Sequence, residues 1–243
     1  MSHFERPERS TMPVEHRRIG INFNERTSPR SRVSMSRATP TVFVVDDDIS
    51  VRESLELLIR CVGWQPETFA SAQDFLSRLP DKTPSCLLLD IELPGLGGLE
   101  LQERLAADRS EMPIIFVTGH GDIPRTVRAM KAGALEFLTK PFQSDVLVQV
   151  IRRAIERSRE ALRQAAELKL LRERYASLTR REREIMTWVV AGLLNKEVAA
   201  ELGRSEATIK AHRGKVMQKM RAGSLADLVR IAARLDLTPV GDP

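Results

Sequence analysis

Residues 1–39 show no periodic pattern of hydrophobic positions, and the pattern changes sharply at Thr41. Thr41–Val45 is a β-branched, apolar run that ends in three aspartates. A run without polar alternation predicts a strand buried on both faces, as in a parallel sheet. The same criterion predicts strands at 85–90, 114–118 and 135–139, separated by helices near 97–107 and 124–132.

Two other helices have recognisable starts. Ser50-Val51-Arg52-Glu53 and Ser71-Ala72-Gln73-Asp74 both have the spacing of a helix N-terminal cap. In the first of these helices, one face is apolar, with Leu55, Leu58, Ile59 and Val62. Five alternations of strand and helix over about 115 residues predict an α/β doubly wound five-stranded parallel sheet, with its ligand site at the carboxyl ends of the strands.

Residues 144–174 contain neither glycine nor proline and predict a long helical linker. Small and apolar residues recur in it at steps of four and three, a weak heptad pattern. They are Leu147, Ile151, Ala154, Ser158, Ala161, Ala165 and Leu168. Either the last helix of the α/β domain continues as a linker, or this helix pairs with a second chain. The Ala and Ser residues in the pattern favour the first interpretation.

The remaining part predicts an all-α four-helix domain. Thr179-Arg180-Arg181-Glu182 is a capping box, and a break at Gly192 precedes a short helix near 195–202. Gly203-Arg204 forms a turn, Ser205 caps a longer helix to about Met220, and Ser224 caps a fourth. A helix, a tight turn and a capped longer helix are the layout of a helix-turn-helix.

The longer helix has two different faces. Its core face holds Ile209, Val216 and Met220. Its opposite face holds Lys210, Ala211 and Gly214, which could enter a major groove, with Arg213 and Lys215 beside them to neutralise phosphates. The alternative is an amphipathic four-helix module whose basic face is merely solvated.

Charge is distributed unevenly along the chain, whose formal net charge is +5. Residues 41–142 hold 10 basic and 16 acidic side chains, whereas residues 175–243 hold 12 and 8. An acidic domain before a basic one suits a metal-binding, phosphate-accepting module fused to a nucleic-acid binder. Ordinary variation in surface charge is the alternative.

Residues 1–39 hold eight Arg and no Lys, with many Ser and Pro, and we predict a disordered tail. Met35 lies just before the first strand, and we hypothesise that the natural start is there. Cys61 and Cys86 lie in apolar company and form no CxxC pair, which indicates buried, reduced thiols in a cytoplasmic protein. No run approaches the roughly 18 apolar residues of a membrane span.

Acidic and donor groups follow successive strands of the predicted sheet. Asp46 and Asp47 follow the first strand, Asp90 and Thr118 end two others, and Lys140 follows the last. Crowded carboxylates repel, so one is protonated or a divalent cation lies among them, and oxygen ligands suit Mg²⁺. A carboxylate beside Mg²⁺ can accept a phosphoryl group, with Lys140 and the Thr118 hydroxyl holding phosphoryl oxygens.

Four segments resemble the receiver domains of two-component response regulators, the FixJ type most closely. They are Val44–Asp48, Leu89–Gly95, Val117–Asp122 and Phe137–Phe142. The resemblance covers about residues 41–145 and implies a flavodoxin-like fold. His120, in the third segment, could be a phosphate carrier or a metal ligand, but we favour a mobile loop residue.

The receiver resemblance implies a role for each pocket residue. Asp90 is the phosphoacceptor and Lys140 contacts the phosphate. Asp90 and Asp47 bind Mg²⁺ together with the Glu92 backbone carbonyl, and Asp46 binds it mostly through water. Thr118 and Phe137 are the coupled switch pair. The bond between Lys140 and Pro141 is expected to be cis.

The C-terminal part resembles LuxR/FixJ/NarL-type DNA-binding domains over about residues 174–238. The segments that carry this resemblance are Leu178–Ile185, Asn195–Ala199 and Thr208–His212, with Gly192, Leu202, Ser205 and Val216. It implies DNA contacts by Thr208, Lys210, Ala211, Arg213 and Lys215, and a less certain one by Gly214, where the family often has a longer residue. His212 is expected to have a structural or phosphate-binding role.

Together the two resemblances imply a response regulator with a tail at 1–39, a receiver at 40–143, a linker at 144–174 and a DNA-binding domain at 175–243. A sensor histidine kinase phosphorylates it, and it dimerises through the fourth helix and fifth strand, near residues 124–139. It then binds double-stranded promoter DNA, acts with RNA polymerase and activates transcription.

Two alternative functions are weighed against this one. An aspartyl-phosphate phosphatase of the haloacid dehalogenase class needs a second aspartate where Glu92 stands. A phosphate-independent interaction switch would not need the complete pocket.

Overall fold

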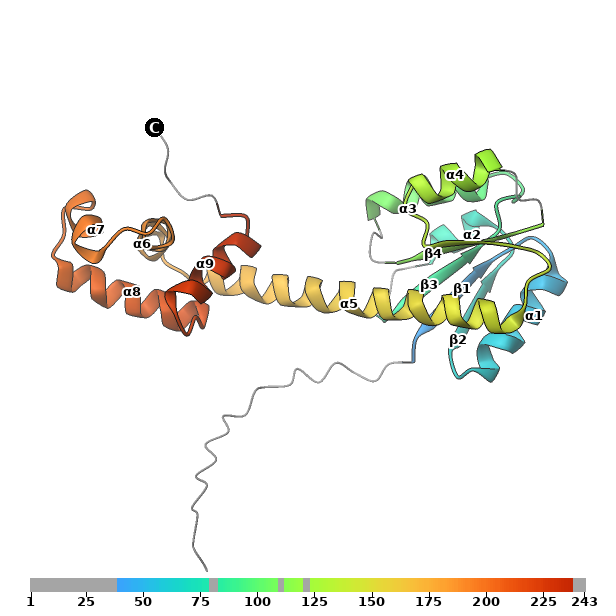
Figure 1. The fold of residues 1–243 in the computed structure, drawn as a ribbon, viewed down its shortest axis with the longest axis horizontal. Helices are drawn as coiled ribbons and strands as arrows, with labels where there is room; N and C mark the ends of the chain where they lie inside the picture. Colours follow the sequence, from blue (N-terminus) through green and yellow to red (C-terminus); the bar gives the residue numbers. More distant parts are fainter. Residues whose placement is uncertain (1–38, 79–82, 109–111, 120–122, 238–243) are drawn as a thin grey trace, which may run out of the picture. The chain divides into compact units, whose positions relative to one another are not determined.

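A computed structural model describes residues 39–78, 83–108, 112–119 and 123–237 of the chain (Figure 1). The predicted disordered tail, with Met35, lies outside the described residues apart from Thr39, and so does His120. Within the described ranges, no helix has both the length and the apolar composition needed to cross a bilayer.

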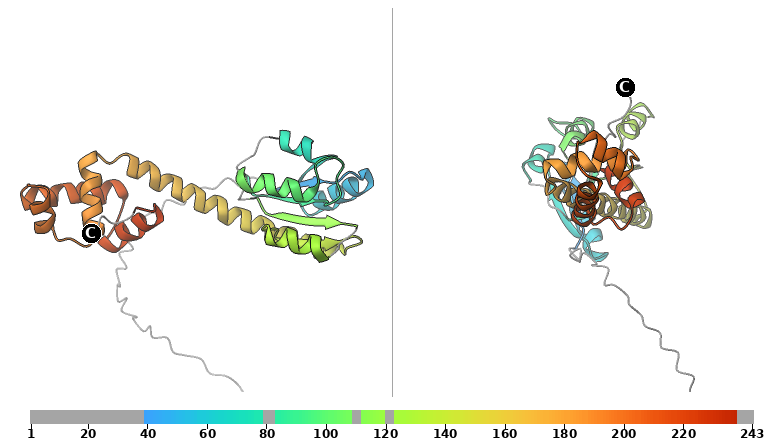
Figure 2. Two further views of the ribbon diagram at one scale, coloured as in Figure 1. Left: turned by 90° about the horizontal axis from the view of Figure 1, so that it is seen from above. Right: turned by 90° about the vertical axis from the view of Figure 1, so that its left-hand side faces the viewer.

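The sheet has five parallel strands in the order β2-β1-β3-β4-β5. Figure 2 gives two further views of the ribbon. Four lie where the hydrophobic runs predicted them: β1 (Thr41–Val45), β3 (Ser85–Leu89), β4 (Ile114–Thr118) and β5 (Glu136–Thr139). The remaining strand, β2 (Gln65–Phe69), was not located by pattern. It contains Pro66 and lies at an edge, where a residue without an N–H group is tolerated.

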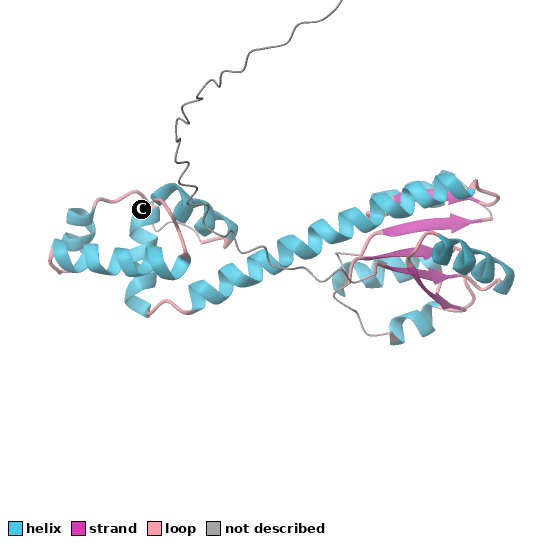
Figure 3. Cartoon of the chain, turned by 90° about the horizontal axis from the view of Figure 1, so that it is seen from below, coloured by secondary structure: helices cyan, strands magenta, loops and turns pink. Residues whose placement is uncertain are grey.

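Helices cover both faces of this sheet (Figures 1 and 3). One face carries α1 (Ile49–Cys61) and the first half of α5 (Ser144–Ala176). The other carries α2 (Ala72–Ser77), α3 (Gly98–Asp108) and α4 (Ile123–Lys131). Successive residues of each strand point to opposite faces of the sheet and therefore belong to two separate hydrophobic cores. Val42 and Val44 pack with α1 and α5, while Phe43 and Val45 pack on the opposite side.

The prediction of two buried thiols is confirmed for Cys86, on β3, and wrong for Cys61. Cys61 is the last residue of α1 and is exposed, because it lies off the face of the helix on which Leu55 and Ile59 are buried.

The predicted cap of α1 at Ser50 is wrong. Asp48 is the N-cap, and its carboxylate accepts a hydrogen bond of 2.8 Å from the Ser50 backbone N–H. Aspartate caps as well as serine does, and Asp48 lies closer to the end of β1, so the helix begins before Ser50. The other predicted caps, Ser71, Thr179, Ser205 and Ser224, are confirmed by side-chain bonds to backbone N–H groups.

α5 is one continuous helix of 33 residues. The first half of its heptad pattern is buried in the α/β domain: Leu147, Ile151, Ala154 and Ser158. The Ser158 hydroxyl accepts a hydrogen bond of 3.0 Å from the backbone N–H of Ser85, at the start of β3. For this half, the first interpretation is therefore confirmed: α5 is the last helix of the α/β domain and continues beyond it. Ala161, Ala165 and Leu168, in the second half, are not buried.

The C-terminal part is helical, as predicted. It contains α6 (Arg180–Val190), α7 (Asn195–Glu201), α8 (Glu206–Met220) and α9 (Leu225–Arg234). Its core cluster includes Ile185, Val198, Ile209, Val216, Met220 and Leu228, so the predicted core face of α8 is confirmed.

Candidate functional site: an acidic pocket and an exposed helix face

The register of the sheet brings the acidic residues together. Val45 pairs with Leu89 across β1 and β3, so the residues that follow them, Asp46 and Asp90, leave the sheet side by side. Carboxylate oxygens of Asp46, Asp47 and Asp90 all lie within 4.8 Å of one another. Asp46 and Asp90 are buried, whereas Asp47 is exposed. The pocket is thus shielded from solvent at Asp46 and Asp90 and open to solvent at Asp47.

Lys140 enters this pocket from β5. Its Nζ donates to Asp46 Oδ2 at 2.6 Å and to Asp90 Oδ2 at 2.8 Å. Its backbone N–H donates to the Thr118 carbonyl at 2.8 Å, which ties the loop after β5 to the end of β4. The peptide bond between Lys140 and Pro141 is cis, as the family resemblance implied.

Buried Asp46 and half-buried Lys140 respond to this environment in different ways. Burial raises the pKa of Asp46 above its ordinary value, and the opposing hydrogen bond from Lys140 does not offset this. Burial alone would lower the pKa of Lys140, but its hydrogen bonds with Asp46 and Asp90 outweigh burial and raise it. Its raised pKa means that Lys140 stays a cation at neutral pH.

Two further residues, which the sequence motifs did not predict, contact the backbone of the pocket aspartates. Arg52 Nη1, on α1, donates to the backbone carbonyls of Asp46 and Asp47 at 2.7 and 2.9 Å. At the start of α3, a Cβ on Gly98 would lie 2.1 Å from the carbonyl oxygen of Asp90, so only glycine fits. The glycine-rich run at 94–98 was the available signal for this close approach.

The other predicted pocket residues lie around this centre. Thr118 is fully buried at the end of β4, and Phe137 is half-buried with its ring centroid 6.4 Å from that of Phe116. The backbone N–H of Glu92 donates to Asp90 Oδ1 at 3.1 Å. The exposed Glu92 carboxylate pairs with Arg125 on α4 at 2.7 Å.

The pocket fits a hard divalent cation. Three carboxylates converge on one point, one of them open to solvent, and among the described residues Lys140 forms ion pairs with two of them. Oxygen donors with room for water and phosphate are the ligands that Mg²⁺ prefers. The residues predicted as metal ligands through their side chains, Asp46, Asp47 and Asp90, are thus brought together.

The outward face of α8 holds the residues predicted to contact DNA. Lys210, Ala211, Gly214 and Lys215 are exposed. A Cβ on Gly214 would meet nothing within 4 Å, so no contact inside the chain requires glycine there.

Three other polar residues of α8 are engaged or partly enclosed. Arg213 is half-buried and donates to Asn195 Oδ1 at 3.1 Å, which ties α8 to the start of α7. Thr208 is exposed, but its N–H and hydroxyl both bond to the hydroxyl of the cap residue Ser205. His212 is half-buried, and its Nδ1 is enclosed with no hydrogen-bond partner among the described residues. We therefore expect Lys210 and Lys215 to reach a ligand more easily than Arg213.

Comparisons with known proteins agree with this geometry. Residues 42–152 match the response regulator receiver domain family, and residues 176–232 match the luxR family of bacterial regulatory proteins. Nodulation protein W of Bradyrhizobium diazoefficiens is 53% identical over 201 residues, covering 81% of this chain and 87% of that protein. The transcriptional regulatory protein FixJ of the same organism is 44% identical over 193 residues, covering 79% and 94%.

A solved structure gives the same result at the level of the fold. The response regulator StyR superposes with a TM-score of 0.73 at 46% identity, covering 81% of this chain and all of that one. The chain therefore belongs to the FixJ-type response regulators, which join a receiver domain to a LuxR-type DNA-binding domain.

Proposed function

We propose that phosphoryl transfer to Asp90 from a sensor histidine kinase controls the binding of this chain to promoter DNA. The observation that carries the proposal is the convergence of Asp46, Asp47 and Lys140 on Asp90 at one end of the sheet. The Asp90 carboxylate is buried and already held by Lys140 and by the Glu92 N–H group, so little reorganisation precedes reaction.

In the proposed reaction, an Asp90 carboxylate oxygen attacks the phosphorus of a phosphohistidine. A P–O bond forms while the P–N bond breaks, and the imidazole leaves with the electron pair and takes up a proton. Lys140 compensates one phosphoryl oxygen as a point charge, and the Thr118 hydroxyl can donate to another. Mg²⁺ held by Asp46, Asp47, Asp90 and the Glu92 carbonyl would neutralise charge on the phosphoryl group.

We further propose that Thr118 and Phe137 transmit this event to the surface of α4 and β5. Ile123, Val127 and Met130 of α4 are exposed by 80, 43 and 41%, which supports a contact with a second copy there. The dimer would present two α8 helices to adjacent half-sites of double-stranded DNA. We also propose that the chain activates transcription together with RNA polymerase. Its receiver, linker and DNA-binding domain would span 40–143, 144–174 and 175–243.

The test is selection of genomic DNA fragments by the full chain, with and without acetyl phosphate and Mg²⁺. We expect tighter binding of the selected fragment after phosphorylation, and no such gain in Asp90→Asn. Lys210→Ala should weaken binding to the selected fragment more than to unrelated DNA, because it removes a base contact. Lys215→Ala should weaken both alike, because it removes a phosphate contact. Equal affinity with and without phosphorylation would overturn the proposal.

A further inference from the structure

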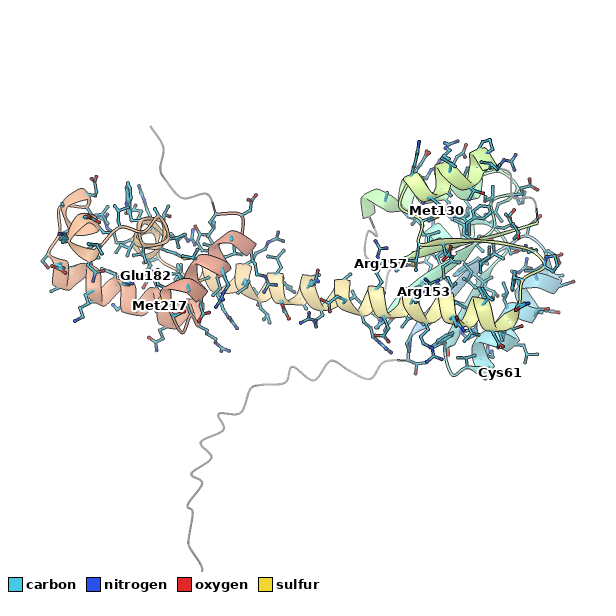
Figure 4. All side chains as sticks on the ribbon, in the orientation of Figure 1. Cys61, Met130, Arg153, Arg157, Glu182 and Met217 are labelled. Atoms are coloured by element: carbon cyan, nitrogen blue, oxygen red, sulfur yellow. The ribbon has the colours of Figure 1, made fainter. Side chains whose placement is uncertain are left out.

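α4 is held by few apolar contacts. Ala129 is its buried residue, while Ile123, Val127 and Met130 (labelled in Figure 4) are exposed. α1, in contrast, buries two large side chains, Leu55 and Ile59. Burial of apolar side chains is the main contribution that holds a helix on a sheet. Because α4 buries little apolar surface, polar contacts must help to position it.

Polar contacts from α4 to its neighbours include two ion pairs and one hydrogen bond. Arg125 Nη1 pairs with Glu92 Oε1 at 2.7 Å, and Arg128 Nη2 pairs with Glu103 Oε1, on α3, at 2.7 Å. Gln102 Nε2, also on α3, donates to the Ala129 carbonyl at 3.1 Å. Arg125 and Arg128 are three residues apart and therefore lie on the same side of the helix.

The contact between α3 and α4 is not fully satisfied. Gln102 is only 2% exposed, and within the described residues its Oε1 has no hydrogen-bond partner. If the amide were turned around, Oε1 would face the Ala129 carbonyl oxygen, which already accepts from the Ala134 N–H at 3.1 Å, and two acceptors would meet. A buried unpaired acceptor is costly, so the observed position of α4 has a small energetic advantage over its alternatives.

Glu92 links this helix directly to Asp90. Its backbone N–H donates to Asp90 Oδ1, and its side chain pairs with Arg125 in the first turn of α4. The ion pair between Arg128 and Glu103 has no such link, because Glu103 lies on α3. A change of charge at Asp90 can therefore reach α4 through Glu92, in addition to the proposed path through Thr118 and Phe137.

We propose that the Glu92–Arg125 ion pair is a latch that holds α4 in its position in the unphosphorylated chain, and that phosphorylation of Asp90 weakens it. The inference rests on the proposed function, because it needs Asp90 as phosphoacceptor. A phosphoryl group brings a charge of about −2 beside the Glu92 carboxylate, repels it and competes for Arg125. Arg125 is thus a positioning residue. It holds α4 in place and is connected to Asp90 through Glu92.

Thermodynamic linkage predicts the direction in which loss of the ion pair should change the affinity of Asp90 for a phosphoryl analogue. If the latch favours the unphosphorylated form, breaking it must raise the affinity of Asp90 for a phosphoryl analogue. Beryllofluoride with Mg²⁺, titrated into the full chain and followed by fluorine NMR, measures this affinity. We expect Arg125→Ala to bind about two- to fivefold more tightly, the range for an exposed ion pair. Simple electrostatics predicts the opposite, because the variant loses a positive charge near the pocket.

Three further variants make the test specific. Arg128→Ala breaks a pair of equal length on the same helix and should leave the affinity within twofold of wild type. In a Glu92→Gln background, Arg125→Ala should have no further effect, because the pair is already broken. Arg125→Lys keeps a cation opposite Glu92 and should leave the affinity within twofold of wild type.

Weaker or unchanged binding by Arg125→Ala would overturn the latch, as would an equal effect of Arg128→Ala. The proposed function would fail differently, because the wild-type chain would then not bind beryllofluoride at Asp90 at all.

Discussion

In both the receiver and the helical domain, buried carboxylates form ion pairs with a lysine. In the helical domain, Glu182 (labelled in Figure 4) is 4% exposed and accepts from Lys219 at 2.6 Å. In the receiver, Asp46 and Asp90 are 3 and 8% exposed and accept from Lys140 at 2.6 and 2.8 Å. The distances are alike, but the number of carboxylates for each lysine is not.

The pair in the helical domain is balanced. Glu182 also accepts from the Thr179 N–H at 2.8 Å, and Lys219 also donates to the Ser177 carbonyl at 3.2 Å. The hydrogen bond from Lys219 lowers the pKa of Glu182, whereas burial raises that of Asp46. In the receiver, Asp47 adds a further carboxylate to the group around Lys140. Balanced buried charge holds a fold together, and unbalanced buried charge indicates a site for a ligand.

The largest effect is expected where the balance is destroyed. Lys219→Met leaves the buried Glu182 carboxylate without its cation and should lower the unfolding free energy of the helical domain by about 3 kcal/mol. Urea unfolding followed by Trp188 fluorescence, in a Trp64→Phe background, measures it. Lys219→Arg is the matched control. A loss below about 1 kcal/mol, on the scale of surface ion pairs, would show that this pair does not hold the domain together.

A smaller effect is expected from protonation of the same pair. Because its folded pKa is lowered from the unfolded value of 4.5, Glu182 contributes stability above pH 4.5 that is lost as the pH falls through the folded pKa. Unfolding followed by Trp188 fluorescence at a series of pH values checks this. The Glu182→Gln variant should show a flatter profile in that window. An equally steep profile would assign the pH dependence to other groups.

The receiver should respond in the opposite direction. Asp90→Asn removes one of three clustered carboxylates and should raise the unfolding free energy by about 1 kcal/mol in metal-free buffer. Trp64 fluorescence in a Trp188→Phe background reports on this domain. A loss as large as that of Lys219→Met would mean that the acidic pocket is structural, and the contrast between the domains would disappear.

The smallest effect is expected from an exposed pair. Arg60 and Glu56, on α1, have side chains 58 and 37% exposed. Arg60→Ala should change the unfolding free energy by less than about 0.5 kcal/mol, because water already solvates both groups. A larger change in the same fluorescence assay would mean that burial does not separate structural pairs from surface pairs.

Much of this structure was predictable because its signals are local. Buried strands such as Thr41–Val45 and caps such as Thr179 depend on neighbouring residues, and the order of strand ends places Asp90 beside Asp46. β2 escaped prediction because Gln65–Phe69 is a short edge strand with a proline and few apolar residues. The α1 cap was misplaced because Asp48 and Ser50 are both good caps two residues apart.

Contacts between residues far apart in sequence were not predictable. The Glu92–Arg125 pair, the Lys219–Glu182 pair and the engagement of Arg213 by Asn195 all depend on tertiary packing. Spacing alone placed Arg213 among free phosphate-binding residues, but its side chain already has a partner within the domain.

The most direct test of the unbalanced pocket is to locate the residue that acetyl phosphate modifies. The full chain would be treated with acetyl phosphate with and without Mg²⁺, and the modified residue mapped by mass spectrometry. We predict a single phosphoryl group on Asp90 that requires Mg²⁺, is absent from Asp90→Asn and is unchanged in Glu182→Gln. Modification of another residue, or labelling that persists in Asp90→Asn, would contradict the assignment of Asp90 as phosphoacceptor.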